Sequence, residues 1–360
     1  MGSAASISER SVMVTKTPSR RIEFLDVLRG LAALLVLIQH SVESTSPSFA
    51  HFTNHNFNLG EIGVVIFFIV SGFIIPVSLE KYNSLPKFWV GRVLRLWPTY
   101  TVSLIVMLLL NRFLPMLPPY YEQHPLGFIV GNISMIGEYL GIPFALGTYW
   151  TLSLELAFYL VCSVLFFFGF LKKTELWLWV SALLLLFSQI GLGLAIHRTL
   201  PSGRLGLIVT AFFGTLLYRL LSEGFPAKRV YAVLPVLFVV FSVGFWLRYK
   251  VYASPNNSVD TSNAIVSWVI AYALFMLVFA LRARKMPRIL IWIGQISYPL
   301  YLFHGVTLVI LNKIFPSGWP LRLLIVLSAG LLVSDLVHRF IEKPVARFQH
   351  RIIPHKPVVV

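Results

Sequence analysis

The chain has 360 residues, of which 57% are hydrophobic and only 12% are charged. Soluble domains carry about a quarter charged residues, so this composition excludes an ordinary soluble protein and indicates a polytopic membrane protein. The net charge of +16 would suggest nucleic-acid binding in a soluble protein, but here the basic residues lie in short loops between apolar runs. We therefore expect a lipid bilayer, and no nucleic acid, as the partner of this charge.

The predicted fold is an all-α integral membrane protein with about ten transmembrane helices. Ten apolar stretches are long enough to cross a bilayer. They cover residues 24–42, 60–79, 95–114, 148–170, 176–196, 203–221, 230–247, 264–281, 289–311 and 321–340. A weaker apolar piece at 126–140 is long for a loop and short for a span. It predicts one re-entrant or interfacial segment between spans 3 and 4.

Lysine and arginine positions predict the orientation. Most of the 30 basic residues fall on one side if the chain crosses ten times with both termini cytoplasmic. We expect a cytoplasmic tail at 1–22, a single transmembrane domain at 23–342 and a basic cytoplasmic tail at 343–360. The first helix follows a polar segment and exceeds the length of a signal-peptide core, so we expect it to remain uncleaved.

The first predicted span carries Arg29 and His40, eleven residues apart. That separation is three helical turns plus roughly 20°, which places both side chains on one face about 16 Å apart. Ionisable residues inside a membrane are costly and indicate a functional site. Asp26 lies at a spacing that allows pairing with Arg29. A snorkelling arginine and an interfacial histidine are the alternatives.

The third predicted span begins with Arg92 and Arg95, which share a helix face. Two planar, permanently charged side chains suit phosphate oxygens, such as those of coenzyme A. The alternative is a positively charged anchor that touches lipid headgroups.

Polar residues interrupt three further apolar spans. Glu155 needs a partner, a proton or water, and either a structural or a catalytic role accounts for it. The Ser71–Gly72 pair permits close helix approach. In the segment 296–304, Tyr298 and His304 flank Pro299, which predicts a kink at the proline. No zinc-binding or serine-hydrolase motif occurs, and the single Cys162 excludes a multi-cysteine metal site, so we expect no metal.

Five of these segments, in this order, resemble the acyltransferase-3 family of integral membrane acyltransferases. They are residues 24–40, 67–73, 92–98, 150–160 and 296–304, which together extend over nearly the whole membrane region. In the fourth, Thr151 and Leu152 stand where the family usually has a Ser-Leu register, which leaves Ser153 without a clear counterpart.

The resemblance implies an O-acyltransferase of a bacterial inner membrane. Its donor would be acetyl-CoA or another cytoplasmic acyl-CoA, with no permanently bound cofactor. Its acceptor would be a hydroxyl of an exported or lipid-linked glycan, such as exopolysaccharide, with polysaccharide assembly machinery as a partner. Family members that modify peptidoglycan often carry an added hydrolase-like domain, so we expect a stand-alone glycan modifier.

The resemblance also implies roles for nine residues. Arg92, Arg95 and Arg29 would bind the donor, with Arg29 along the acyl path. His40 would act as general base or acyl relay, and Glu155 would orient groups in the pocket. The pocket would further contain Asp26, Ser71, Tyr298 and His304. Two rivals remain: an acyltransferase that tailors a macrolide-like metabolite, and a polytopic glycan transporter that transfers no acyl group.

Overall fold

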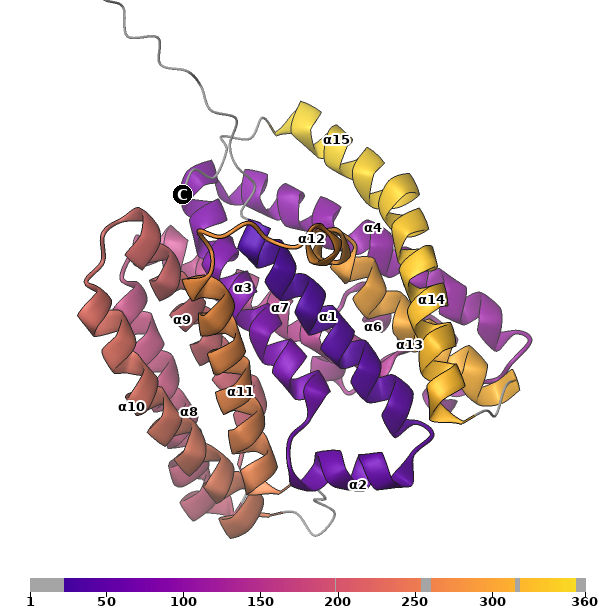
Figure 1. Cartoon of the computed structure of the whole chain (residues 1–360), viewed down its shortest axis with the longest axis horizontal. Coiled ribbons are helices and arrows are strands. Elements are labelled where there is room, and N and C mark those ends of the chain that lie inside the picture. Colours follow the sequence, from indigo (N-terminus) through magenta and orange to yellow (C-terminus); the bar gives the residue numbers. More distant parts are fainter. Residues whose placement is uncertain (1–22, 198, 254–259, 315–317, 354–360) are drawn as a thin grey trace, which may run out of the picture.

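The computed structural model describes residues 23–197, 199–253, 260–314 and 318–353, and every regular element within these ranges is a helix. Figure 1 shows the helices as one bundle with α1 and α3 near its centre. The long helices are α1 (Glu23–Glu43), α3 (Leu59–Tyr82), α4 (Leu85–Asn111), α7 (Trp150–Phe167), α8 (Thr174–Ile196), α9 (Ser202–Ser222), α10 (Ala227–Trp246), α11 (Thr261–Ala280), α13 (Ser297–Ile314) and α14 (Trp319–Val337). The short ones are α2 (Pro47–His55), α5 (Pro119–Gln123), α6 (Pro125–Ile133), η1 (Gly137–Leu140), η2 (Gly147–Tyr149), η3 (Leu247–Val251), α12 (Arg288–Gln295), η4 (His338–Glu342) and α15 (Lys343–Ile352).

Nine helices in the described ranges are long and apolar enough to cross a membrane, and a tenth crossing results if the bent pair α12–α13 counts as one span. The all-α membrane fold with about ten helices is therefore confirmed. The predicted ninth span, 289–311, is not one continuous helix, because α12 and α13 meet at 70°.

The break lies at Ile296, between Gln295 and Ser297, and the predicted kink at Pro299 is wrong. Pro299 instead lies in the first turn of α13, where a helix has no partner for a backbone N–H and a proline is tolerated. Ser297 begins α13 and donates its hydroxyl to the Gly294 carbonyl at 2.8 Å. This bond holds the two helices together across the break.

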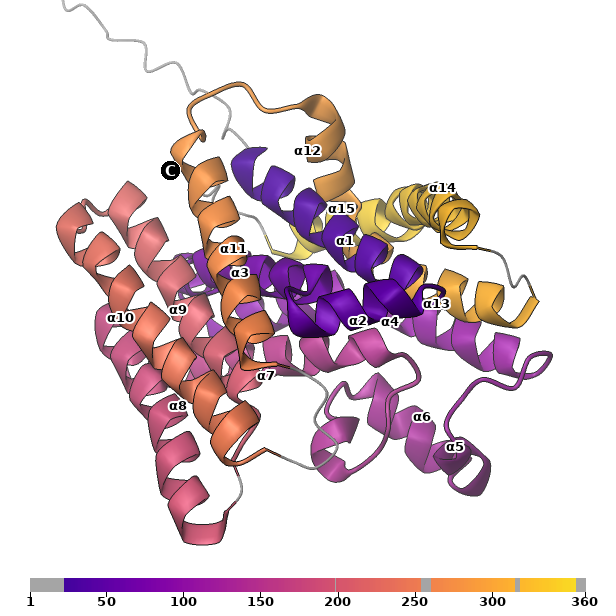
Figure 2. The ribbon, with the colours of Figure 1, turned by 60° about the horizontal axis from the view of Figure 1, so that its bottom comes forward.

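The segment 126–140 does not cross, as expected from its length. It forms α6 and η1, and it folds back against the middle of α4. Trp97 and Tyr100 of α4 each donate a hydrogen bond of 2.9 Å, to the carbonyls of Ile133 and Asn132 respectively. Figure 2 shows α5 and α6 along one edge of the bundle.

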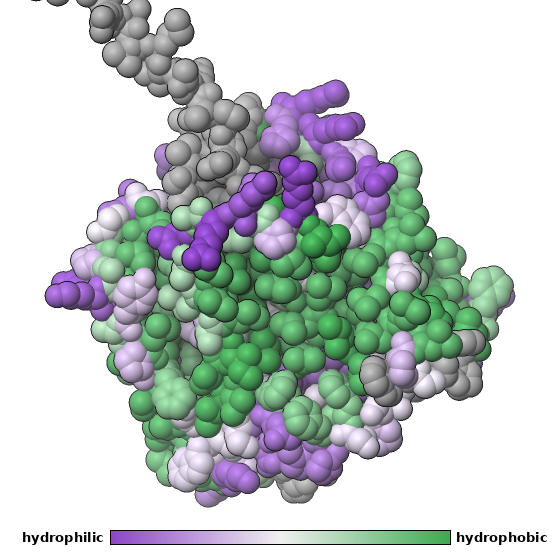
Figure 3. All heavy atoms as spheres, in the orientation of Figure 1, coloured by the Kyte–Doolittle hydropathy of each residue, from purple (hydrophilic) through white to green (hydrophobic). Residues whose placement is uncertain are grey.

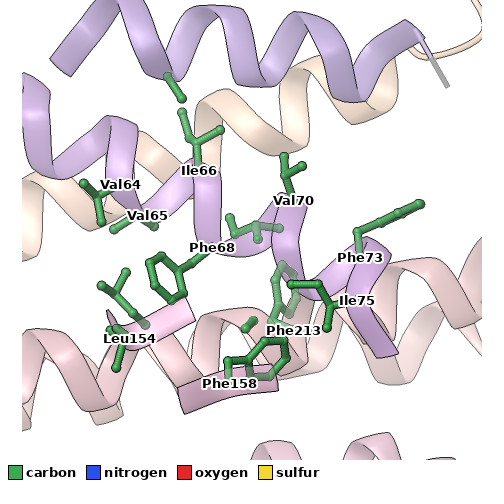
Figure 4. Close-up of a cluster of buried hydrophobic side chains, with 14 of the residues drawn as sticks. Val64, Val65, Ile66, Phe68, Val70, Phe73, Ile75, Leu154, Phe158 and Phe213 are labelled. Atoms are coloured by element: carbon green, nitrogen blue, oxygen red, sulfur yellow. The ribbon is translucent and has the colours of Figure 1, made fainter. Parts of the chain in front are cut away.

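Helix α3 lies at the centre of the fold and is apolar on all sides. Figure 4 shows its side chains, including Phe68 and Ile75, facing Phe158 of α7 and Phe213 of α9. A Cβ on Gly72 would overlap the backbone of Ala211 in α9. The predicted role of the Ser71–Gly72 pair in close helix packing is confirmed for the glycine.

Two polar rims bound a wide apolar belt on the surface in Figure 3. One rim, which we call the basic end, contains the exposed Arg282, Arg284, Lys285 and Arg288 between α11 and α12, together with α15. The opposite rim contains α2 and is called the α2 end. The predicted basic tail from 343 begins as α15, which continues the helix of α14 and η4.

Candidate active site

Six of the nine predicted site residues line one cavity of about 100 Å³, which we call the arginine cavity. They come from α1, α3, α4, α7 and α13. The six are Arg29, Ser71, Arg92, Arg95, Glu155 and Tyr298. Residues spread over 270 positions of sequence thus meet because five helices converge.

The two arginines of α4 reach this cavity because the helix begins at Leu85, ten residues before the predicted span. Arg92 Nη2 donates to Ser78 Oγ at 2.9 Å, and the guanidinium lies over the rings of Phe88 and Tyr159 at 5.4 and 5.7 Å. Arg92 Nε is buried with no hydrogen-bond partner among the described residues. A buried donor without an acceptor is costly, so this N–H is available to an anionic ligand.

Glu155 faces the arginines from α7. Its Oε1 accepts a hydrogen bond of 2.6 Å from Tyr159 Oη, one turn along the same helix. Arg29 reaches the cavity from α1, and its Nη1 lies 3.9 Å from Oδ1 of the buried Asp26. Asp26 itself does not line the cavity, so it orients Arg29 from behind. The cavity therefore has three cations and one carboxylate.

His40 lines a second and larger cavity of about 640 Å³, which we call the histidine cavity. Trp150, Arg204 and Glu61 also line it. The Arg204 guanidinium pairs with Glu138 at 2.6 Å and lies 5.5 Å from the Trp150 ring centre. Aromatic and charged polar side chains around a wide cavity suit a hydroxyl-rich ligand better than an apolar one.

His40 and His304 form a hydrogen-bonded pair. His40 Nδ1 lies 3.1 Å from His304 Nε2, and the rings stack with centroids 5.3 Å apart. His304 Nδ1 lies 3.1 Å from the Leu300 carbonyl, which only accepts, so His304 carries its proton on Nδ1. A neutral His304 then accepts at Nε2, and His40 must donate from Nδ1. This assignment leaves His40 Nε2 with a lone pair, as a general base requires.

One wall separates the two cavities. Val64 of α3 and Tyr301 of α13 line both of them. Tyr301 Oη lies 2.9 Å from Thr151 Oγ1 and donates to the Thr148 carbonyl at 3.2 Å. We call this wall the Tyr301 partition. Arg29 and His40, predicted to share one face of α1, lie on its opposite sides.

Sequence reasoning missed Tyr301, Thr151 and Tyr159. The signal was present, because Thr151, Glu155 and Tyr159 are spaced four residues apart and so share one face of α7. Ser153, whose place in the motif was open, donates to the Met135 carbonyl and lines neither cavity. It holds the segment before η1 against α7.

Comparison with known proteins agrees with this arrangement. Residues 22–339 match a family model described as an acyltransferase domain, acyltransferase 3. The chain belongs to the acyltransferase-3 family. Residues of both cavities lie within the matched range.

Named members of the acyltransferase-3 family are similar to the chain over most of its length. The peptidoglycan O-acetyltransferase OatA of Listeria monocytogenes is 26% identical over 92% of this chain and 57% of its own length. The exopolysaccharide production protein ExoZ of Rhizobium meliloti is 27% identical over 82% of this chain and 92% of its own. The acyltransferase MdmB of Streptomyces mycarofaciens is 28% identical, but over only 39% of this chain and 38% of its own length. The chain thus spans less than two thirds of OatA.

Proposed function

We propose that this protein moves an acetyl group from acyl-CoA at the basic end to a glycan hydroxyl at the α2 end. The Tyr301 partition carries the proposal, since it has a cationic cavity on one side and a histidine with a free lone pair on the other. The similarity to OatA and ExoZ, a named O-acetyltransferase and a named exopolysaccharide production protein, supports a glycan acceptor.

On the donor side, phosphate oxygens of CoA pair with Arg92 and Arg95. The unpartnered Arg92 Nε supplies one charge-assisted hydrogen bond, and Arg95 is exposed at the mouth of the cavity. The thioester then extends past Arg29 and Glu155 toward Tyr301. The positive-inside rule places the basic end in the cytoplasm, where acyl-CoA is made.

On the acceptor side, His40 Nε2 takes the proton of a glycan hydroxyl. The hydroxyl oxygen attacks the thioester carbonyl carbon, the carbon–sulfur bond breaks, and the proton passes to the leaving thiolate. The products are the glycan ester and free CoA. A base is needed because a sugar hydroxyl at neutral pH is a poor nucleophile. His304 acts as a positioning residue that fixes the tautomer of His40.

Purified protein in vesicles tests the proposal. Radiolabelled acetyl-CoA is added with exopolysaccharide or peptidoglycan fragments from the native host, and label in the glycan is measured. We expect label with the wild type and a loss of about 10²-fold or more with His40→Ala. The exposed His55→Ala on α2, outside both cavities, serves as the matched control and is expected to match the wild type.

The same vesicles distinguish a transporter. Glycan flux without acetyl-CoA consumption would contradict the enzyme and support a carrier. Wild-type labelling by His40→Ala would exclude His40 from the chemistry. A mass increase of one acetyl group on the protein, with acetyl-CoA alone, would replace direct attack by an acyl-histidine relay.

A further inference from the structure

An apolar groove of about 400 Å³ runs between α10 and α11. Figures 1 and 2 both show these helices side by side on the outside of the bundle. Pro235, Phe238, Val269 and Ala273 are exposed along it, and only Ser242 and Tyr272 contribute side-chain hydroxyls. Small residues at 235 and 273 keep the two helices from filling the space.

The groove ends against the histidine cavity. Trp268 lines both, so one indole ring separates the lipid-facing groove from the cavity that contains His40. Trp268 Nε1 donates to Glu61 Oε1 at 2.7 Å, and its ring packs 4.5 Å from that of Phe241. A ligand chain in the groove therefore lies directly beside the proposed acceptor site.

A cation lies beyond the groove at the α2 end. Arg248 follows Ser242 by six residues, about 9 Å further along the chain, and it lines the histidine cavity. Its hydrogen bonds within the described ranges go to neutral oxygens, the Thr199 carbonyl at 2.9 Å and hydroxyl at 3.0 Å. The guanidinium charge is thus left to attract an anion.

We infer that the α10–α11 groove binds the hydrocarbon chain of a lipid-phosphate-linked glycan, with its phosphate beside Arg248 and its sugar in the histidine cavity. The inference deepens the proposed function and rests on it for the role of the bound lipid. It follows from three features in one line: an apolar groove, a shared indole wall and a cation at the polar end. An anchored acceptor would also lose less freedom on binding than a free one.

Native mass spectrometry of the purified full chain tests the binding, with undecaprenyl phosphate as the probe and phosphatidylglycerol as the competing membrane lipid. We expect wild type to retain undecaprenyl phosphate at least ten-fold better than phosphatidylglycerol. Ala273→Phe, which fills the groove, is expected to abolish this preference. Val239→Phe, an exposed position of α10 outside the groove, is the matched control and should retain it.

A second variant tests the charge. Arg248→Gln is expected to weaken retention of undecaprenyl phosphate about ten-fold and to leave undecaprenol unchanged. Equal retention of both lipids by wild type, or an unaltered preference in Ala273→Phe, would overturn the inference. Binding needs no acyl donor, so intact lipid preference without any acetyl transfer would count against the proposed function alone.

A transfer assay completes the test. We expect Ala273→Phe to lower acetyl transfer to the lipid-linked glycan about ten-fold and to leave transfer to its water-soluble fragment unchanged. Equal losses with both acceptors would overturn the role of the groove in acceptor binding.

Discussion

The two ring nitrogens of His40 lie in different surroundings, one bonded to His304 and the other facing a cavity. The sequence identified both histidines as polar residues inside apolar helices. Their contact was not predictable, because 264 positions separate them and no local pattern links α1 to α13. What folding adds at this scale is the choice of tautomer, which decides whether His40 has a free lone pair.

Removal of His304 tests this pairing. We expect His304→Ala to lower kcat for acetyl transfer about 10²-fold while the KM for acyl-CoA stays unchanged, since the arginine cavity is intact. His304→Gln, whose amide oxygen can accept from His40 Nδ1, should restore part of kcat. Steady-state kinetics in detergent checks both.

Thr307→Ala, one turn further along α13, is the control because that hydroxyl bonds only the Phe303 carbonyl among the described contacts. An unchanged kcat in His304→Ala would contradict the positioning role. A rise in the KM for acyl-CoA together with a lower kcat would point to general damage instead.

At the scale of helices, apolar length predicted existence better than limits. The sequence located every spanning helix, because about twenty apolar residues are needed to cross a bilayer. It placed the third start too late, since Lys87, Arg92 and Arg95 interrupt the apolar run although the helix begins at Leu85. It also read Pro299 as a kink, whereas the break at Ile296 follows from the packing of α12 across α1.

Close packing of α3 on α9 makes Gly72 sensitive to a single added carbon. We expect Gly72→Ala to lower the unfolding free energy by about 1–3 kcal/mol, because its Cβ would overlap the Ala211 backbone, which cannot move aside as a side chain could. Thermal unfolding in detergent, followed by circular dichroism, measures the change.

Gly203→Ala provides the comparison within α9. No atom lies within 4 Å of a Cβ at that position, and alanine is the better helix former. Its midpoint should equal or exceed the wild-type value. Equal midpoints for Gly72→Ala and Gly203→Ala would show that the α3–α9 contact is looser than the structure has it.

At the scale of the whole molecule, the polar rims and the apolar belt agree with a slab-like environment, and the charge bias predicts which rim is cytoplasmic. An even number of crossings requires that α12 and α13 together form one broken span. The orientation then puts acyl-CoA and the arginine cavity on the same side of the membrane.

Cysteine accessibility tests this orientation. In a Cys162→Ala background, Lys285→Cys should react with a membrane-impermeant maleimide in inside-out vesicles, and Asn56→Cys in right-side-out vesicles. Both native side chains are exposed at opposite rims, whereas Cys162 is buried. Labelling of both positions from the same side would contradict the ten-crossing topology.

The sequence by itself determined the membrane class, the number of helices, the charge bias and nearly all polar residues of the two cavities. These follow from local quantities, namely apolar length, charge and helical spacing. Only the tertiary structure decided that the polar residues divide into two cavities on either side of Tyr301. It also decided that Asp26 stands behind Arg29 and that His304 orients His40. Such contacts depend on how five helices cross, and crossing geometry is set by packing between residues far apart in sequence.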